Sequence, residues 1–347
     1  MTIPYRTRRV CKRIFSVLLA VILVAVFLLL CWLLWLDRFL VYTHEGVRLD
    51  FSQSGELSGG LLSEDTPTQP TVPIHFGDGD ELQSGQLTKL SGYYILEADL
   101  AAASTSRTPK EDSAKKIDTL IEKVRALPAG TPVMLEVKNI KGRFFYASGV
   151  GNNRSSLIDE QKVEALIAAL RQQNCYLIAT LPAFRDYYFG LNNVPLGLHH
   201  SSGRYLWQDE SGCYWLNPQQ QGALTYLVQI INELKGKGFH EVVFSDFRIP
   251  DTNNILFDAD RSEAISKAAS TIVTACAGDT FCVSFAADTT FPLPEGRTRL
   301  YLEGVNAADC AATAEQAGLA ETAERLVFLT ASRDTRFESY GVIRPIE

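Results

Sequence analysis

The stretch Gly222-ALTYLVQIINELKGKGFHEVVFSDFRI-Pro250 decides the fold class. Its first half carries apolar residues three and four positions apart, which predicts an amphipathic helix. These residues are Leu224, Leu227, Ile230, Ile231 and Leu234. Gly236 and Gly238 predict the end of the helix, because glycine readily adopts the left-handed conformation found there. The apolar run 242–244 then predicts a parallel strand that is buried on both faces.

Polar residues follow this strand directly, at Ser245, Asp246 and Arg248. In α/β barrels, the residues that carry the chemistry lie at the carboxyl ends of the parallel strands. The carboxylate of Asp246 and the guanidinium of Arg248 are therefore candidate functional groups.

From Leu90 onward, apolar strand patterns alternate with helical patterns. The expected strands are 93–99, 132–139, 176–184, 242–244, 281–287, 299–303, 325–330 and 341–345. Besides the helix before 242, the expected helices are 113–127, 159–173, 260–277 and 307–323. This alternation predicts an α/β fold, a (β/α)8 TIM-type barrel. The connections 289–297 and 333–339 are short for a full helix, so the barrel should be irregular in its second half; a doubly wound open sheet is the alternative.

The amino-terminal region predicts a membrane anchor. Residues 14–36 form an apolar run of 23 residues interrupted only by Ser16, long enough for a hydrocarbon core of about 30 Å. The basic residues before it predict a cytoplasmic amino terminus and an extracellular main domain. They are Arg6, Arg8, Arg9, Lys12 and Arg13. A cleaved signal peptide is the weaker alternative, because no small-x-small site follows Trp35.

The predicted organisation has four parts. Residues 1–13 are a cytoplasmic basic tail, 14–36 a single transmembrane helix, 37–88 an extracellular stalk and 89–347 the barrel domain. The stalk is assigned from its Ser, Gly, Thr, Pro and Asp content, which is typical of linkers. We therefore expect a single-pass protein of the cell membrane.

Composition narrows the function classes. The apolar share of 46% and charged share of 21% are those of a globular protein. Without the five basic residues of the tail, 28 Lys and Arg oppose 40 Asp and Glu, a net charge of about −12 that disfavours nucleic acid as a partner. Cys276 and Cys282 could pair across a turn, although buried thiols are the favoured interpretation.

Several chemistries lack a sequence signal. The chain contains no CxxC, P-loop or GxSxG motif, and no GxGxxG after a strand. His199 and His200 have no third ligand at metal spacing. We therefore predict neither a metal site nor a cofactor.

The polar residues at the predicted strand ends are the candidate site. They are Glu97, Asp99, Glu136, Lys138, Arg185, Asp186, Asp246, Arg248, Asp288, Glu303, Arg333 and Asp334. Glycoside hydrolysis requires one acid to protonate the leaving oxygen and a second carboxylate to attack or to activate water. We select Asp246, Glu303 and Asp288 as candidate catalytic residues. The candidate substrate-binding residues are Lys138, Arg185, Asp186, Trp207, Trp215 and Arg248, with the tryptophans expected to stack on sugar rings. Each carboxylate could instead be a solvated loop residue or a salt-bridge partner.

Residues 88–290 resemble a glycosyl hydrolase domain family of bacterial surface proteins, a TIM-barrel group distantly related to α-amylase-type glycosidases. The resemblance is carried by five segments that occur in the family's order. They are Val133-MLEVK-Asn139, Ile178-ATLPAFR-Asp186, Gly203-RYL-Trp207, Trp215-LN-Pro218 and Lys235-GKGFHEVVFSDFRI-Pro250. The resemblance implies a glycan-hydrolysing barrel and a polysaccharide ligand.

The sequence departs from the family pattern at several site positions. Ser245 stands where the family has its presumed catalytic Asp, and Asp246 stands where it has Tyr. Thr180 replaces an Arg and Asn139 an Asp. Since strand side chains alternate between faces, a one-residue displacement would aim Asp246 away from the pocket unless a bulge restores it. Two hypotheses follow: an extracellular glycoside hydrolase acting on cell-envelope or environmental polysaccharide, or an inactive barrel that binds glycan or an envelope protein. A purely structural barrel is a third.

Overall fold

A computed structural model describes residues 40–43, 46–49, 87–288 and 291–346. In the first unit of the chain, strands β1 (Leu40–Thr43) and β2 (Gly46–Leu49) pair antiparallel within the predicted stalk. In the part of the chain that is described, no helix is long and apolar enough to cross a membrane. The predicted transmembrane segment 14–36 lies outside the described residues.

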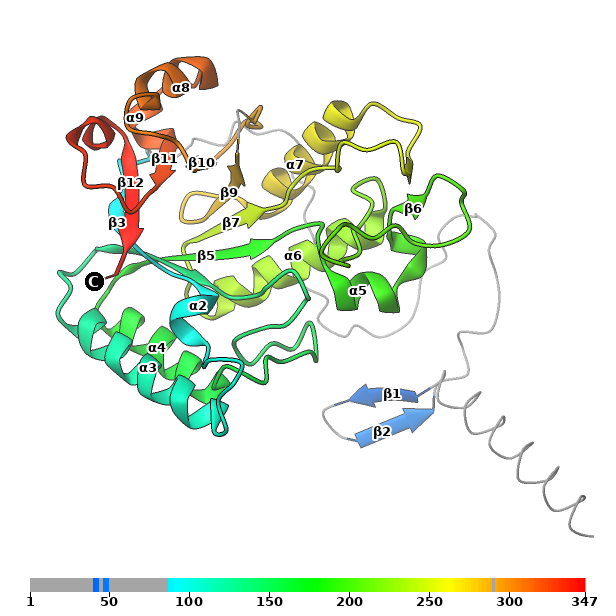
Figure 1. The fold of residues 1–347 in the computed structure, drawn as a ribbon, viewed down its shortest axis with the longest axis horizontal. Helices are drawn as coiled ribbons and strands as arrows, with labels where there is room; N and C mark the ends of the chain where they lie inside the picture. The colour runs from blue at the N-terminus through cyan, green and yellow to red at the C-terminus, as the bar shows by residue number, and fades with distance from the viewer. Residues whose placement is uncertain (1–39, 44–45, 50–86, 289–290, 347) are drawn as a thin grey trace, which may run out of the picture. The chain divides into compact units, whose positions relative to one another are not determined.

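The second unit is built on a closed parallel barrel (Figure 1). Its strands follow one another around the barrel in chain order: β3 (Ser91–Ile95), β4 (Pro132–Glu136), β5 (Tyr176–Pro182), β7 (Glu241–Ser245), β9 (Cys282–Ala287), β10 (Leu300–Glu303), β11 (Leu326–Leu329) and β12 (Gly341–Pro345). β12 then pairs with β3 to close the ring. The predicted TIM-type barrel is confirmed, and the open-sheet alternative is excluded.

Helices connect the first five strands and cover the outside of the barrel. The larger ones are α3 (Pro109–Arg125), α4 (Glu160–Gln172), α6 (Gln221–Gly236) and α7 (Arg261–Cys276). In helix α6, all five apolar residues of the predicted face are buried. The helix ends at Gly236, and Gly238 has a φ of +89°. Residues 222–250 thus form the helix and strand that the spacing of their apolar residues predicts.

Alternate residues along the strands fall into two apolar clusters. Met134, Ile178 and Val243 belong to one cluster of strand residues. Their neighbours Leu135, Ala179 and Val242 belong to the larger cluster that includes the helices. This is the inward and outward alternation expected of a barrel whose centre is filled with side chains.

The second half of the barrel has less helix. Among its described residues, the connection from β9 to β10 holds no helix, and the connection from β11 to β12 holds only the 3-10 helix η2 (Thr335–Ser339). The helix expected at 307–323 is two shorter ones, α8 (Cys310–Ala317) and α9 (Thr322–Arg325). Gly318, with a φ of +60°, ends α8.

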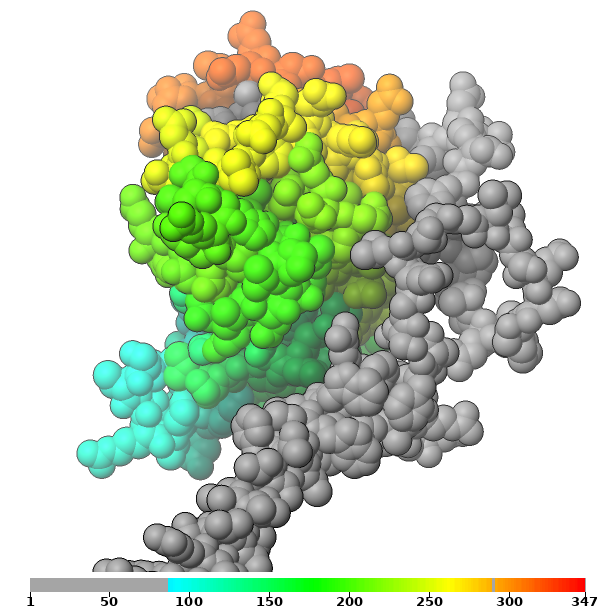
Figure 2. Space-filling view, turned by 90° about the vertical axis from the view of Figure 1, so that its right-hand side faces the viewer, coloured from blue at the N-terminus to red at the C-terminus, as the bar shows by residue number. Residues whose placement is uncertain are grey.

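Figure 2 shows the surface of this domain passing from cyan through green and yellow to orange, the order of its segments in the chain.

The first predicted strand is too long at its carboxyl end. Residues 93–99 were expected to be extended, but β3 ends at Ile95 and Glu97–Leu100 form the short helix α2. The Asp99 carboxylate accepts a hydrogen bond from Leu96 N–H at 2.9 Å, and such a bond stabilises the first turn of a helix. Glu97 and Asp99 therefore lie on α2 and not at a strand end.

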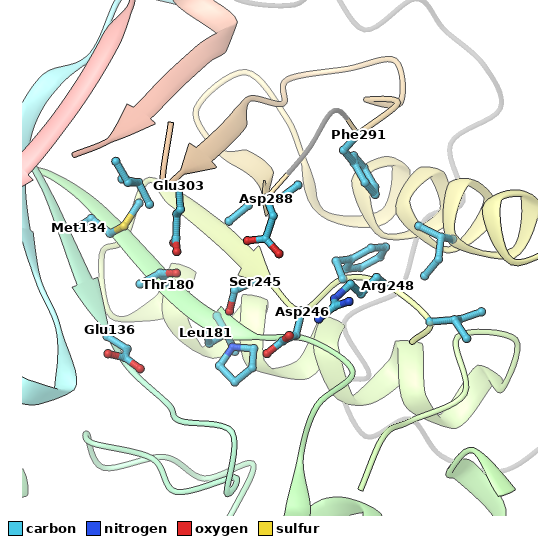
Figure 3. Close-up of a pocket in the computed structure, with 18 of the residues that line it drawn as sticks. Met134, Glu136, Thr180, Leu181, Ser245, Asp246, Arg248, Asp288, Phe291 and Glu303 are labelled. Carbon is cyan, nitrogen blue, oxygen red and sulfur yellow. The ribbon is translucent and has the colours of Figure 1, made fainter. Parts of the chain in front are cut away.

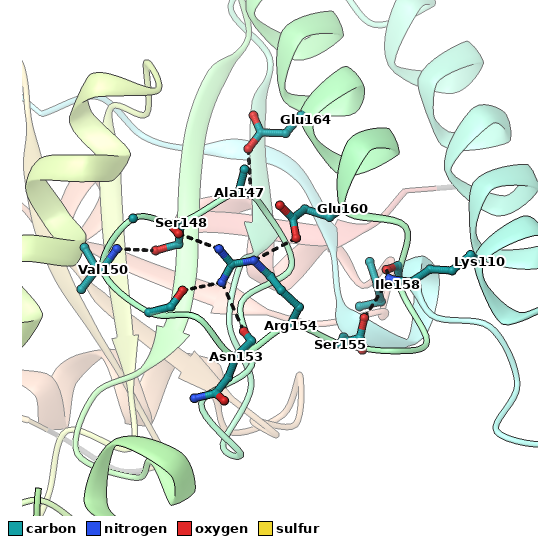
Figure 4. A network of polar contacts seen from close by, with 12 residues as sticks. Lys110, Ala147, Ser148, Val150, Asn153, Arg154, Ser155, Ile158, Glu160 and Glu164 are labelled. Atoms are coloured by element: carbon teal, nitrogen blue, oxygen red, sulfur yellow. Dashed lines mark hydrogen bonds and ion pairs between the residues drawn. The ribbon is translucent and has the colours of Figure 1, made fainter. Parts of the chain in front are cut away.

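The loop from β4 to α4 is held by polar contacts (Figure 4). Arg154 pairs with Glu160 at 2.8 Å and donates to the Ser148 carbonyl at 2.6 Å. Lys110 of α3 donates to the Ser155 carbonyl at 2.9 Å. Ala147 N–H donates to Glu164 of α4 at 2.9 Å. These contacts fix a loop that contains no regular structure of its own.

Strands β6 (His199–His200) and β8 (Ile255–Leu256) pair antiparallel in a separate small sheet. β6 follows α5 (Tyr187–Asn192) and the 3-10 helix η1 (Val194–Leu196). In this sheet, the His200 ring stacks on Tyr205, with the ring centroids 4.7 Å apart. Cys276 and Cys282 are buried free thiols and form no disulfide.

Candidate active site

A pocket of about 950 Å³ lies at the carboxyl ends of the barrel strands (Figure 3). β4, β5, β7, β9 and β10 each contribute residues at or just past their last position. The acidic residues among them are Glu136, Asp246, Asp288 and Glu303. The size suits a small-molecule or sugar ligand, since such pockets commonly enclose about 300–1,000 Å³.

Asp246 follows directly after β7 in a left-handed conformation. Its φ is +49°, a region that few residues other than glycine occupy. Ser245 and Asp246 both line the pocket, whereas consecutive residues of a regular strand point to opposite faces. The left-handed turn breaks that alternation, so the one-residue displacement does not remove the carboxylate from the pocket. Backbone strain of this kind tends to occur at functional sites.

Arg185 connects Asp246 to the long loop after β5. Its Nη1 lies 3.9 Å from Asp246 Oδ2, and its Nε donates to Asp209 Oδ2 at 2.6 Å. Asp209 also accepts a hydrogen bond from Trp215 Nε1 at 2.9 Å. Burial alone would raise the pKa of Asp209, but the hydrogen bonds from Cys213 N–H, Trp215 and Arg185 lower it. Asp209 is therefore held as a carboxylate that orients Arg185.

Trp215, in the long loop after β5, contacts two arginines. The guanidinium of Arg185 is 5.7 Å from its ring centroid and that of Arg248 is 5.6 Å away. Cation–π contacts of this length are attractive. Trp215 is only 2% exposed, so it positions the two arginines and does not offer a face to a sugar ring.

The three predicted catalytic acids meet in the pocket. Burial raises the pKa of Asp246, and the Arg185 and Arg248 guanidinium groups offset part of this rise. Burial also raises the pKa of Glu303, and the negative charges of Asp288 and Asp246 raise it further. Figure 3 shows Asp288 and Glu303 reaching into the same space above Ser245. Repulsion between neighbouring carboxyl groups separates their pKa values, so that at neutral pH one group can act as an acid and another as a base.

Glu136, the last residue of β4, is the fourth acid of the pocket. Its Oε2 accepts a hydrogen bond from Glu97 N–H at 2.6 Å. Burial raises the pKa of Glu136 to about 7, and the charges of Glu97, Glu303 and Asp99 add to the effect of burial. The sequence placed Glu136 at a strand end but gave no reason to prefer it over the other carboxylates.

Lys138 and Asp186 lie elsewhere, contrary to the prediction that they bind substrate. They form an ion pair at 2.6 Å in which both side chains are 0% exposed. The Tyr226 hydroxyl donates to the same Asp186 oxygen at 2.9 Å, and Asp186 Oδ1 caps α5 through Phe189 N–H. The pair holds the loops after β4 and β5 together, because a buried charge requires such partners. In this conformation neither residue can contact a ligand.

The aromatic lining also differs from the prediction. Trp207 packs against the outer apolar cluster, and neither Trp207 nor Trp215 is among the residues of the pocket wall. The aromatic residues of the wall are Tyr94, Phe247 and Phe291. Phe247 lies in the Asp-Phe-Arg run directly after β7.

The described residues contain no group of His, Cys, Asp and Glu arranged to hold a metal ion. With its acids, arginines and aromatic wall at the carboxyl ends of barrel strands, the domain has a glycoside hydrolase-like fold. Residues 108–278 match the model of a family described as "Putative glycosyl hydrolase domain". The matched segment contains α3, β4, β5 and β7, so the resemblance predicted from the sequence is confirmed over these residues.

Solved structures resemble this chain at low sequence identity. A hypothetical protein from Ruminiclostridium thermocellum is 17% identical, with 55% of this chain and 96% of that chain covered and a TM-score of 0.45. The GH20 exo β-N-acetylglucosaminidase of Vibrio harveyi is 9% identical (73% and 42% covered, TM-score 0.48). The GH36 α-galactosidase AgaA of Geobacillus stearothermophilus is 10% identical (76% and 40% covered, TM-score 0.47). This chain thus spans less than half the length of these two hydrolases. No curated protein sequence matches it significantly.

Proposed function

We propose that the protein is a glycoside hydrolase acting on a polysaccharide of the cell envelope or the environment. The observation that carries this proposal is the convergence of Asp246, Asp288 and Glu303 on one pocket at the carboxyl end of the barrel. The family match over residues 108–278 supports the same activity.

Asp246 is the carboxylate that attacks the anomeric carbon or activates water. The guanidinium groups of Arg185 and Arg248 act on it and offset part of the rise in its pKa that burial causes. Hydrolysis then breaks the bond between the anomeric carbon and the leaving oxygen, a second carboxyl group protonates that oxygen, and water supplies the new hydroxyl. Phe291 and Tyr94 provide apolar surface against which a sugar ring can pack.

We also propose that residues 14–36 anchor the chain in the cell membrane, with residues 89–347 outside the cell. The 23-residue apolar run and the basic cluster before it support this topology. Protease added to intact cells should then digest the barrel domain. Digestion only after lysis would contradict the extracellular location.

The activity is tested with the full chain purified in detergent. The protein is incubated with peptidoglycan, chitin, xylan, β-glucan and starch, and new reducing ends are measured. We expect release from at least one polysaccharide by the wild type and by Glu315→Gln, a control at an exposed position on α8. Asp246→Asn should release none. No release from any member of a broad panel would overturn the proposal.

A second candidate function is glycan binding without hydrolysis. The observation in its favour is Ser245, which ends β7 and lines the pocket. The sequence resemblance implies that the family carries its presumed catalytic Asp at this position. A binding protein should retain insoluble polysaccharide equally well as wild type and as Asp246→Asn, but more weakly after Phe291→Ala. Turnover by the wild type would exclude this alternative.

A further inference from the structure

Glu136 occupies a pocket position that the sequence did not single out. It ends β4 and pairs in register with Thr180 of β5, and both residues line the pocket. Strand β5 therefore separates it from β7, which leads into Asp246. Adjacent strands are about 4.8 Å apart, so two strand spacings separate β4, which ends in Glu136, from β7, which leads into Asp246.

The contacts of Glu136 differ from those of Asp246. One oxygen of Glu136 accepts the Glu97 N–H at 2.6 Å, which orients the carboxyl group. In the described part of the chain no Lys or Arg pairs with it, whereas Asp246 has Arg185 at 3.9 Å. The charged groups that act on Glu136 are Glu97 and Asp99 of α2 and Glu303 of β10.

These surroundings disfavour the ionised form of Glu136. Removing a proton from Glu136 adds a negative charge near those of Glu97, Glu303 and Asp99. Burial and the charges of Glu97, Glu303 and Asp99 raise the pKa of Glu136 to about 7. Glu136 therefore holds a proton at pH values well above those at which an ordinary glutamic acid is ionised.

On the basis of the proposed hydrolase function, we infer that Glu136 is the proton donor to the leaving oxygen and that Asp246 is its carboxylate partner. In the reaction, the proton of Glu136 moves to the glycosidic oxygen as the bond to the anomeric carbon breaks, and the electron pair of that bond remains on the oxygen. Glu97 N–H stabilises the carboxylate that forms. Water delivers a hydroxyl to the anomeric carbon and a proton back to the site.

The test compares two substrates of the sugar that the polysaccharide panel identifies: the natural glycan and its 2,4-dinitrophenyl glycoside. The aryl group leaves without protonation, so only the glycan requires the donor. We expect Glu136→Gln to lower kcat/KM for the glycan by about 10²–10⁴-fold, the usual range for general acid catalysis. Its kcat/KM for the aryl glycoside should fall by less than about tenfold. Glu315→Gln should behave as wild type with both.

The pH profile gives an independent measurement. For the wild type, kcat/KM should fall as the pH rises through about 7, and Glu136→Gln should lack this fall. Glu97→Gln removes one of the charges that raise the pKa of Glu136, so the fall should move to lower pH. This second variant keeps the inference testable if Glu136→Gln does not fold.

Four results would overturn the inference, and the first three leave the proposed function intact. Equal losses on both substrates, or an unchanged pH profile in Glu136→Gln, would exclude Glu136 as donor while hydrolysis stands. A Glu136 carboxyl that titrates below pH 5 in the ¹³C NMR spectrum would do the same. A wild type that cleaves neither substrate would overturn the hydrolase function and the donor role together.

Discussion

Two acidic residues at opposite ends of one strand differ in almost every contact. Glu241 begins β7 at the amino-terminal end of the barrel, and Asp246 follows β7 at the carboxyl end. Glu241 accepts hydrogen bonds from Arg299 at 2.6 Å, Tyr176 at 3.0 Å and Tyr301 at 2.9 Å. Ser284 donates to it at 2.6 Å. Asp246 has one loose ion pair, at 3.9 Å.

The difference indicates that the amino-terminal end of the barrel stabilises the fold, whereas the carboxyl end carries the candidate chemistry. A buried carboxylate whose oxygens are all paired has no capacity left for a ligand. The partners of Glu241 connect β5, β7, β9 and β10 near their amino-terminal ends. The carboxylates at the other end share a pocket and repel one another. TIM barrels in general place function at the carboxyl ends of their strands and stability at the opposite ends.

Asp246→Asn changes the acid at the carboxyl end of β7 and should have the largest effect on activity. We expect hydrolysis to fall by about 10³-fold or more, because a catalytic carboxylate cannot be replaced by an amide. The fold should persist, since Asn tolerates the left-handed conformation at this position. Activity and thermal unfolding are measured on the same sample. Loss of activity together with a collapse of the melting temperature would assign Asp246 a structural role.

Arg299→Met removes the ion-pair partner of Glu241 at the amino-terminal end of β7. Removing one partner of a buried ion pair leaves an uncompensated charge and typically costs about 3–5 kcal/mol. We expect a loss of this size in the free energy of unfolding by urea. The double variant Glu241→Gln/Arg299→Met should recover part of it. A loss below about 1 kcal/mol would show that the Glu241 cluster does not stabilise the barrel.

The stability of the protein should depend on the protonation of Glu136. Its folded pKa of about 7 lies above the ordinary 4.5, so the folded state binds the proton more tightly than the unfolded state. Stability from this group is therefore full below about pH 4.5 and is lost as the pH rises to about 7, by up to about 3 kcal/mol. Urea unfolding at pH 5 and pH 8 should show a smaller difference for Glu136→Gln than for wild type. Equal differences would contradict the raised pKa.

Arg185→Gln removes the ion-pair partner of Asp246 and should have the smallest effect of these variants. Arg185 lowers the pKa of Asp246, so its removal should raise that pKa. The acidic limb of the hydrolysis profile should move to higher pH by about one unit or less, because the pair is long and partly solvated. A profile identical to that of the wild type would mean that Arg185 does not influence Asp246.

The parts of the molecule that follow from periodicity could be predicted from the sequence. Leu224, Leu227, Ile230, Ile231 and Leu234 form the buried face of α6, and the apolar runs became barrel strands. The end of β3 could not be predicted, because Asp99 caps a helix that interrupts an extended pattern. Likewise, the helix expected at 307–323 ends early at Gly318. The sequence around this glycine is compatible both with a continuous helix and with a helix end.

The candidate site was predictable in position but less so in detail. Asp246, Asp288 and Glu303 converge because the carboxyl ends of parallel strands meet at one end of a barrel. Lys138, Asp186 and Trp215 were predicted as ligand contacts, whereas the structure buries all three. Loop packing leaves no periodic signal from which this burial could be predicted. The character of Glu136 depends on Glu97, Asp99 and Glu303, which approach it only in the folded chain.

The most direct test of the account is a crystal structure of Asp246→Asn with an oligosaccharide that the wild type cleaves. We predict a glycosidic bond held in the carboxyl-end pocket, with its oxygen within hydrogen-bond distance of Glu136 and its anomeric carbon facing residue 246. An oligosaccharide bound outside this pocket, for example on the loop that carries Trp207, would contradict the account.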